Sequence, residues 1–232
     1  MAQMGYGYGS EFQLLRFLGH HRRLLESEIQ KVIGSTNQQF YWFDFDFADR
    51  EMVISGDREM TGLSFLRRSS LIPEEKLKIV EEIVRSYNWN FEQWQNWDAV
   101  FINNGIVYFV EAKAHKDEIS SGDKTHGGSS SHAICEFMSK QFGTLVTEKW
   151  LRKYYQLANR LSTVKLLNDN GIPAKIVNIF FIDGYYDRNH QICKDTNLET
   201  YKDAIAKEDN ELGISDVKDK YVVEVFIDAN PN

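Results

Sequence analysis

The stretch WDAVFINNGIVYFVEAKAH, residues 97–115, decides the fold because it combines two apolar runs with a strong turn signal. Asparagine and glycine at positions 103–105 separate the runs, which is typical of a β-hairpin. Side chains alternate between the faces of a strand, so Glu111, Lys113 and His115 would share one face. An acid, an ammonium and an imidazole therefore project together from the end of an otherwise apolar strand.

The two arms of this hairpin also place a second carboxylate near the first. Asp98 and Glu111 stand at similar distances from the turn, so their carboxylates can converge. Two such groups repel one another unless a cation or a shared proton lies between them. Hard oxygen ligands favour Mg²⁺, which binds through one or two carboxylates and keeps several waters. We therefore expect Asp98, Glu111 and the Ala112 carbonyl to bind Mg²⁺, with Mn²⁺ as a substitute and Lys113 beside the attacking water.

Periodicity predicts further elements on both sides of the hairpin. We expect helices over residues 10–34, 73–87 and 147–171, a short helix near 133–142 and another near 198–206. The alternation of residues 43–47 predicts a half-buried strand with Asp44 and Asp46 on its solvated face. AKIVNIFFID, residues 174–183, reads as a strand buried on both faces, and YVVEVFID, residues 221–228, as a last strand. Helices on both sides of a mixed sheet form the economical α/β architecture.

Composition indicates one domain spanning residues 1–232, in which 1–70 form an N-terminal addition, 73–183 a core and 184–232 a C-terminal helix and strand. The chain is 42% hydrophobic and has only two cysteines, so a reduced, cytoplasmic location is the simplest expectation. No signal peptide and no apolar run of about 20 residues is visible, so we expect no membrane span. The net charge of −7 counts against strong non-specific binding of nucleic acid, although a local basic groove remains compatible with it.

Asp98, a dozen intervening residues and the triplet Glu111-Ala112-Lys113 resemble the motif of the PD-(D/E)XK nuclease superfamily. The order helix, hairpin, Glu-Ala-Lys, helix, strand over residues 73–183 also resembles its αβββαβ core. Trp97 stands where the superfamily usually has proline. The phrases GYGSE, WDAV, VEAKAH and YYQLANRL are similar to those of a largely uncharacterised, restriction-endonuclease-like bacterial group.

This resemblance implies a Mg²⁺-dependent phosphodiesterase that acts on nucleic acid, with DNA as the expected substrate. It implies that Asp98 and Glu111 bind the metal and that Lys113 lies beside the attacking water. Some branches place a glutamine on the following helix, for which Gln156 is the candidate, with Tyr155 as a companion. A homodimer would suit the cutting of two strands, but no residue pattern demands one.

Several other polar residues have two readings. His115 is either a rim residue or a neighbour of the substrate, and Glu81 is better explained by a solvated helix face than by a further active-site acid. A basic side of the helix over 147–171 would suit phosphate contacts or a charged outer face; its members are Lys149, Arg152, Lys153, Arg160 and Lys165.

Two functions compete with the nuclease. One is a nucleic-acid-binding module that keeps the nuclease fold without cutting, which the acidic charge favours and the complete Asp98-Glu111-Lys113 set opposes. The other is a hydrolase of small phosphoesters. The sequence does not decide whether the substrate is DNA or RNA, which sequence is the target, or whether cutting is internal or terminal.

Overall fold

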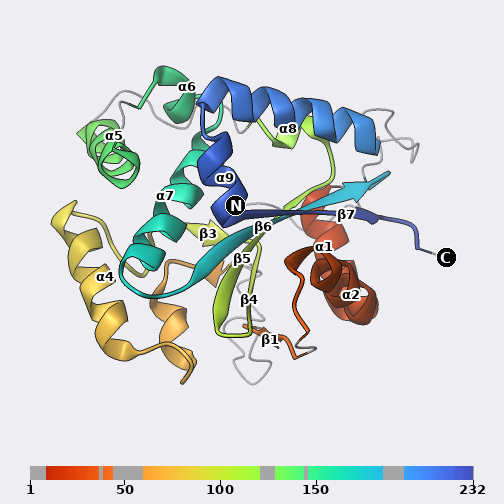
Figure 1. The fold of residues 1–232 in the computed structure, drawn as a ribbon, viewed down its shortest axis with the longest axis horizontal. Coiled ribbons are helices and arrows are strands. Elements are labelled where there is room, and N and C mark those ends of the chain that lie inside the picture. Colours follow the sequence, from red (N-terminus) through yellow and green to blue (C-terminus); the bar gives the residue numbers. More distant parts are fainter. Residues whose placement is uncertain are drawn as a thin grey trace.

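The computed structural model describes residues 9–36, 39–43, 60–120, 129–143, 146–184 and 196–231. These residues form a mixed α/β structure in which a five-stranded sheet lies between helices (Figure 1). The strands of this sheet and of a separate two-stranded ladder are β1 (Tyr41–Trp42), β2 (Met60–Thr61), β3 (Asn96–Trp97), β4 (Ala99–Asn103), β5 (Ile106–Lys113), β6 (Ala174–Ile182) and β7 (Val222–Asp228).

Helices precede the first strand and separate later ones, and the last element is the strand β7. They are α1 (Ser10–His20), α2 (Arg22–Ile33), α4 (Glu74–Ser86), α5 (Ser129–Phe142), α6 (Glu148–Leu151), α7 (Tyr155–Asp169), α8 (Leu198–Leu212) and α9 (Ser215–Tyr221), with short 3₁₀ segments η1 (Ser64–Arg68) and η2 (Lys116–Glu118). Within the described residues, no helix is both long and apolar enough to cross a membrane.

The sheet has the strand order β1-β4-β5-β6-β7. Strand β4 is antiparallel to β1 and to β5, whereas β5, β6 and β7 run parallel to one another. The β4–β5 hairpin confirms the sequence prediction, because Asn104 and Gly105 take positive φ angles of 50° and 74° in its turn. Its last pair is Ala99 with Val110, so Asp98 follows at the open end of the hairpin, one position beyond.

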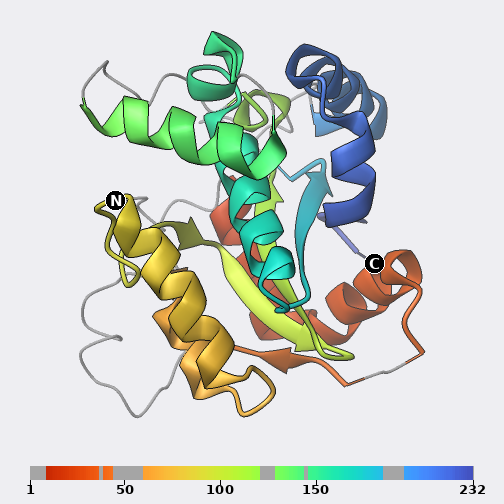
Figure 2. The same ribbon diagram turned by 60° about the vertical axis from the view of Figure 1, so that its left-hand side comes forward.

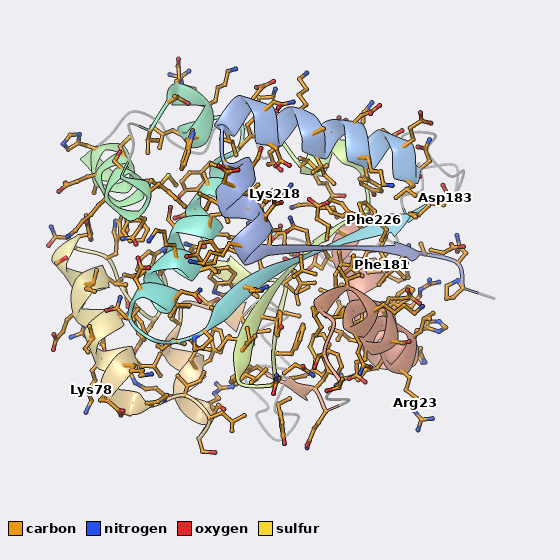
Figure 3. The ribbon with its side chains drawn as sticks, viewed as in Figure 1. Arg23, Lys78, Phe181, Asp183, Lys218 and Phe226 are labelled. Atoms are coloured by element: carbon orange, nitrogen blue, oxygen red, sulfur yellow. The ribbon has the colours of Figure 1, made fainter. Side chains whose placement is uncertain are left out.

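Each face of the sheet buries its own apolar cluster. On one face Val100 and Phe109 pack with residues of α4, α5 and α7, and on the other Phe101 and Val110 pack with α1 and α2. Figure 2, turned by 60°, shows α7 running along one side of the strands. In Figure 3, Phe226 of β7 lies on the side of α8 and Phe181 of β6 on the side of α1. Ring contacts agree, since the rings of Phe181 and Phe17 of α1 lie 5.2 Å apart.

Two predicted long helices are interrupted. The helix expected over residues 10–34 breaks at His21, where φ is −122°, into α1 and α2, whereas its start at Ser10 and its end at Gly34 are confirmed. The helix expected over 147–171 is split by residues 152–154 into α6 and α7. Apolar spacing continues across both breaks, because both halves bury their inward residues against the same cluster. Periodicity alone therefore predicted continuous helices.

The other predicted elements are present with shifted ends. The short helix expected near 133–142 begins earlier, at Ser129, and the tail helix extends to Leu212 before a further helix, α9, that was not predicted. Strand β6 matches its prediction within a residue. The strand expected over 43–47 is described only to Phe43, so Asp44 and Asp46 lie outside the described residues, as does the start of GYGSE.

Candidate active site

The polar residues of the hairpin end lie on the sheet face that α7 covers. Strand alternation puts Glu111 and Lys113 on the same side as Phe109, which packs in the cluster with α7. Both are buried, with 4% and 8% of their surface exposed. Two ionisable groups at this depth require partners, because an unpaired buried charge costs several kcal/mol.

Those partners come from each other and from α7. Lys113 Nζ donates hydrogen bonds to Glu111 Oε1 and, at 2.7 Å, to Gln156 Oε1. Arg160, one turn further along α7, brings Nη2 to 2.6 Å from Glu111 Oε2. The same guanidinium nitrogen donates to the backbone carbonyl of Asn96 at 3.1 Å. The first turns of α7 therefore supply an amide and a cation to the end of β5.

Asp98 is tied to the same strand through the backbone. Its Oδ2 accepts a hydrogen bond from the N–H of Ala112 at 2.7 Å. Burial raises the pKa of Asp98 to about 7, and the nearby charge of Glu111 adds to the rise. Lys113 and Arg160 oppose it without cancelling it. A carboxyl group that is hard to ionise beside a second carboxylate is typical of a paired acid site, in which a cation would favour ionisation of both groups.

The central pocket opens over this cluster. Its polar lining consists of Glu111, Lys113, Gln156, Arg160, Asn178 and Glu208, and its apolar lining of Ile119, Leu157 and Phe180. Asp98 does not line it, because its carboxylate is turned to Ala112. Asn178 faces the pocket because it pairs in register with Glu111 on the neighbouring strand.

Glu111 Oε2 forms an ion pair with Arg160. It is buried and lies 2.6 Å from Arg160 Nη2, in an orientation that makes no regular hydrogen bond. The carboxylate is therefore held mainly by charge, and a metal ion at this oxygen would compete with Arg160 for it. Among the described residues, no three His, Cys, Asp or Glu side chains group as metal ligands. Carboxylate and carbonyl oxygens, as in Asp98, Glu111 and Ala112, are the ligand types that Mg²⁺ takes, and Mg²⁺ needs few protein ligands.

The remaining sequence candidates lie outside the pocket. His115 Nδ1 accepts a hydrogen bond from the N–H of Asp117 at 3.2 Å. Glu81 on α4 pairs with Arg67 and Arg85 at the surface, in agreement with a solvated helix face. Tyr155 lies on the far side of Gln156, where its hydroxyl accepts a hydrogen bond from Asn159 at 3.1 Å.

The predicted basic side of the helix over 147–171 is wrong as a single surface. Arg160 is only 8% exposed and faces the sheet, so it belongs to the pocket. The others form ion pairs along the broken helix: Lys149 and Lys153 with Glu211, Arg152 with Glu148, and Lys165 with Asp169.

Sequence reasoning did not assign three of the pocket residues to this site. Arg160 was named only as one member of a basic helix side, suited to phosphate contacts or to a charged outer face, and Asn178 was visible as the one uncharged polar residue inside the apolar run 174–183. Glu208 gave no signal, because it lies in the charged run Lys207-Glu208-Asp209 and reaches the pocket from the far C-terminal helix. Burial raises the pKa of Glu208 to about 8, and the nearby Lys218 and Lys113 lower it in part.

No protein-family model, curated protein or solved structure matches this chain.

Proposed function

We propose that this protein is a Mg²⁺-dependent nuclease of the PD-(D/E)XK type that hydrolyses phosphodiester bonds of DNA. One observation carries the proposal: Glu111 and Lys113 contact each other under Gln156 on one sheet face, while Asp98 bonds to the residue between them. The succession α4, β4–β5 hairpin, α7, β6 supports an assignment to the restriction-endonuclease-like fold.

Asp98, Glu111 and the carbonyl of Ala112 would hold the metal. In a strand, the N–H and C=O of one residue point to the same neighbouring strand. Because the Ala112 N–H donates to Asp98, the Ala112 carbonyl also points to the Asp98 side of β5. Bound there, Mg²⁺ supplies positive charge to a phosphate oxygen and favours ionised carboxylates around it. Glu111 Oε2, which accepts no hydrogen bond, is the oxygen best placed to turn to it.

Lys113 has the role closest to the nucleophile. Its ammonium group lies at the pocket wall and can orient a water molecule and stabilise the negative charge that develops on the phosphate oxygens. The oxygen of water bonds to phosphorus as the water releases a proton, the bond from phosphorus to the leaving oxygen breaks, and that oxygen takes up a proton from solvent, so that one water is consumed. Glu111 and Gln156 each accept a hydrogen bond from one proton of Lys113, the latter at 2.7 Å, and together they fix the direction of the one ammonium proton that remains.

Arg160 can contact a phosphate in addition to forming its ion pair with Glu111. Its positively charged guanidinium lines the central pocket. When a metal ion neutralises the carboxylate of Glu111, a terminal guanidinium nitrogen of Arg160 can donate a hydrogen bond to a phosphate oxygen instead.

The non-catalytic alternative is favoured by one specific observation. Lys113 and Arg160 each form an ion pair with one oxygen of Glu111, so the cluster is also a buried ion network. Such a network can fix a fold without doing chemistry. The net charge of −7 points the same way.

A cleavage assay decides between these functions. Supercoiled DNA, linear DNA and RNA are incubated with Mg²⁺, Mn²⁺ or a chelator, beside an activated phosphodiester of small size. Lys113→Ala is expected to lower polynucleotide cleavage at least about 100-fold with an unchanged circular dichroism spectrum. Lys165→Ala on the same side of the sheet, whose partner is Asp169, is the matched control.

Cutting that survives Lys113→Ala would refute the assignment. Binding of DNA without cutting by the unmodified protein would favour the non-catalytic module, and faster hydrolysis of the small diester than of any polynucleotide would favour a small-phosphoester hydrolase.

A further inference from the structure

A second pocket adjoins the central pocket along α7. It lies between the segment before β4 and the first turns of α7, and it shares Gln156 and Arg160 with the central pocket. We call it the amide pocket, because side-chain carboxamides make up most of its lining: Gln93, Gln95, Asn96, Gln156 and Asn159.

The chemistry of the amide pocket suits a neutral, flat ligand with polar edges. Within the described part of the chain, neither a carboxylate nor a lysine lines it, and Arg160 is its only charged group. A carboxamide offers both a donor and an acceptor, as the edges of nucleobases do. Trp94 and Tyr155 add two aromatic rings, on which a base can stack. A free phosphate would find only one cation here.

The pocket is preorganised by its own hydrogen bonds. Gln95 donates from its amide nitrogen to Thr163 Oγ1 at 2.5 Å and to the carbonyl of Asn159 at 3.3 Å. The amide nitrogen of Asn159 donates to the hydroxyl of Tyr155 at 3.1 Å. The side-chain amide nitrogens of Gln95 and Asn159 donate these hydrogen bonds, so the orientation of both amides is fixed before a ligand binds. This lowers the entropy cost of binding.

A third pocket shares Ile119 with the central pocket. We call it the lysine pocket, because Lys116, Lys153 and Lys207 line it, together with the two carboxylates of Asp117 and Asp203. Lys153 pairs with Glu211 at 3.0 Å, yet 39% of its side chain remains exposed. Lysines at this position can contact phosphates of a chain that crosses the central pocket.

We propose that the amide pocket binds an unpaired base of the nucleotide next to the bond that is cut, while the lysine pocket contacts phosphates on the other side. This inference rests on the proposed function and names its substrate: a single strand, or a duplex that has opened locally. A paired base keeps its edge occupied by its complement and its faces stacked, so it cannot enter the pocket.

Binding measurements test this inference separately from cleavage. Fluorescence anisotropy is recorded for a labelled octathymidine, for the same strand with one abasic nucleotide at successive positions, and for a blunt duplex, with Ca²⁺ in place of Mg²⁺. We expect the single strand to bind at least about tenfold tighter than the duplex, and one abasic position to weaken binding about tenfold.

Variants assign the abasic effect to the pocket. Trp94→Ala should bind the intact and the abasic strands equally. Trp42→Ala, a tryptophan that packs on Phe101 at the other face of the sheet, should keep the difference. Because Trp94 also packs at 5.1 Å on Trp89 and on Phe137, Gln93→Ala is the second variant, since this exposed side chain lines the pocket with little packing to lose. It should reduce the abasic effect several-fold.

Equal binding of single strand and duplex with no abasic effect, in a protein whose cleavage needs Lys113, would overturn this inference and leave the nuclease intact. An abasic effect that persists unchanged in both Trp94→Ala and Gln93→Ala would also overturn it. Absence of both binding and cleavage of any polynucleotide would overturn the proposed function itself.

Discussion

Arg160 lies 2.6 Å from Glu111, where its guanidinium faces the carboxylate oxygen that accepts no hydrogen bond. The two side chains come from α7 and β5, and each is at most 8% exposed. A cation bound at Glu111 would therefore meet the positive charge of Arg160 at short range. Arg160 both balances the charge of Glu111 in the pocket and competes with a metal for that carboxylate.

Arg160→Gln should separate metal affinity from cleavage. Removing the guanidinium removes its repulsion of a divalent ion, so we expect Mn²⁺ to bind about tenfold tighter. Cleavage should fall about tenfold or more, because a phosphate loses the same charge. Isothermal titration calorimetry with Mn²⁺ measures the metal affinity, and steady-state kinetics measure the cleavage rate.

Arg152→Gln is the control for this pair of effects, because Arg152 forms its ion pair with Glu148 in an exposed position outside the pocket. Weaker Mn²⁺ binding by a folded Arg160→Gln protein would contradict a metal site at Glu111.

Gln156 should act through Lys113. Its Oε1 accepts a hydrogen bond from Lys113 Nζ, so Gln156→Leu leaves one ammonium proton without its partner. We expect kcat to fall about tenfold. Because Gln156 also lines the amide pocket, the Kd for DNA should rise as well, but by less. Gln156→Glu keeps an acceptor for Lys113 and should recover part of the rate, with a pH–rate profile displaced from that of the unmodified protein. A purely structural role would give neither the recovery nor the displacement.

The sequence predicted the geometry of the hairpin end because the information there is local. Asn104-Gly105 fixes the turn, the turn fixes the register, and the register puts Asp98 one step beyond the Ala99–Val110 pair, opposite Glu111. Strand alternation then decides the faces. None of these steps depends on contacts with distant segments. The roles of these residues in metal binding and cleavage remain predictions.

The rest of the site depends on contacts that a linear pattern does not contain. Arg160 has both polar and apolar neighbours in the sequence, so the spacing of apolar residues did not decide whether its side chain faces the sheet or the solvent. It is buried because the carboxylate of Glu111 lies beneath α7 and forms an ion pair with it. The break at residues 152–154 changes the direction of the chain before α7 and thereby places Gln156 over Lys113. Glu208 lines the pocket only because α8 packs back across the sheet end.

Two glycines with similar backbone angles should respond differently to alanine. Gly105 has a φ of 74°, and no atom lies within 4 Å of the place that an added methyl group would take. Gly105→Ala therefore costs only the left-handed backbone strain, about 1 kcal/mol. Gly62, with φ of 68°, would place the same methyl group 2.3 Å from the backbone carbon of Glu92. Gly62→Ala must also displace that backbone and should cost several kcal/mol.

Urea unfolding of both glycine variants provides the comparison. The carbonyl of Gly62 also accepts a hydrogen bond from Trp97 Nε1 at 3.0 Å, next to Asp98, so replacement of Gly62 should disturb the hairpin mouth. Equal loss of stability in the two variants would show that backbone strain, and not the contact with Glu92, dominates at Gly62.

Glu208 should make the protein less stable as the pH rises. Burial raises its pKa from 4.5 to about 8, so between these values the unfolded chain has released a proton that the folded chain retains. Stability from this group is complete below pH 4.5 and is lost as the pH rises to about 8, by a few kcal/mol at most. The charged groups that act on it lie on four elements: Lys113 on β5, Asp209 on α8, Lys218 on α9 and Glu224 on β7.

Glu208→Gln imitates the protonated carboxyl and removes the titration. Between about pH 5 and pH 8, the unfolding temperature of the variant should therefore rise relative to that of the unmodified protein as the pH rises. Above about pH 8 the difference between the two unfolding temperatures should stay constant. Glu199→Gln, an exposed position near the start of the same helix, is the matched control and should give a constant difference. A constant difference for Glu208→Gln as well would mean that Lys218, whose Nζ lies 2.8 Å from Asp209 and 2.6 Å from Glu224, compensates the buried charge of Glu208 fully.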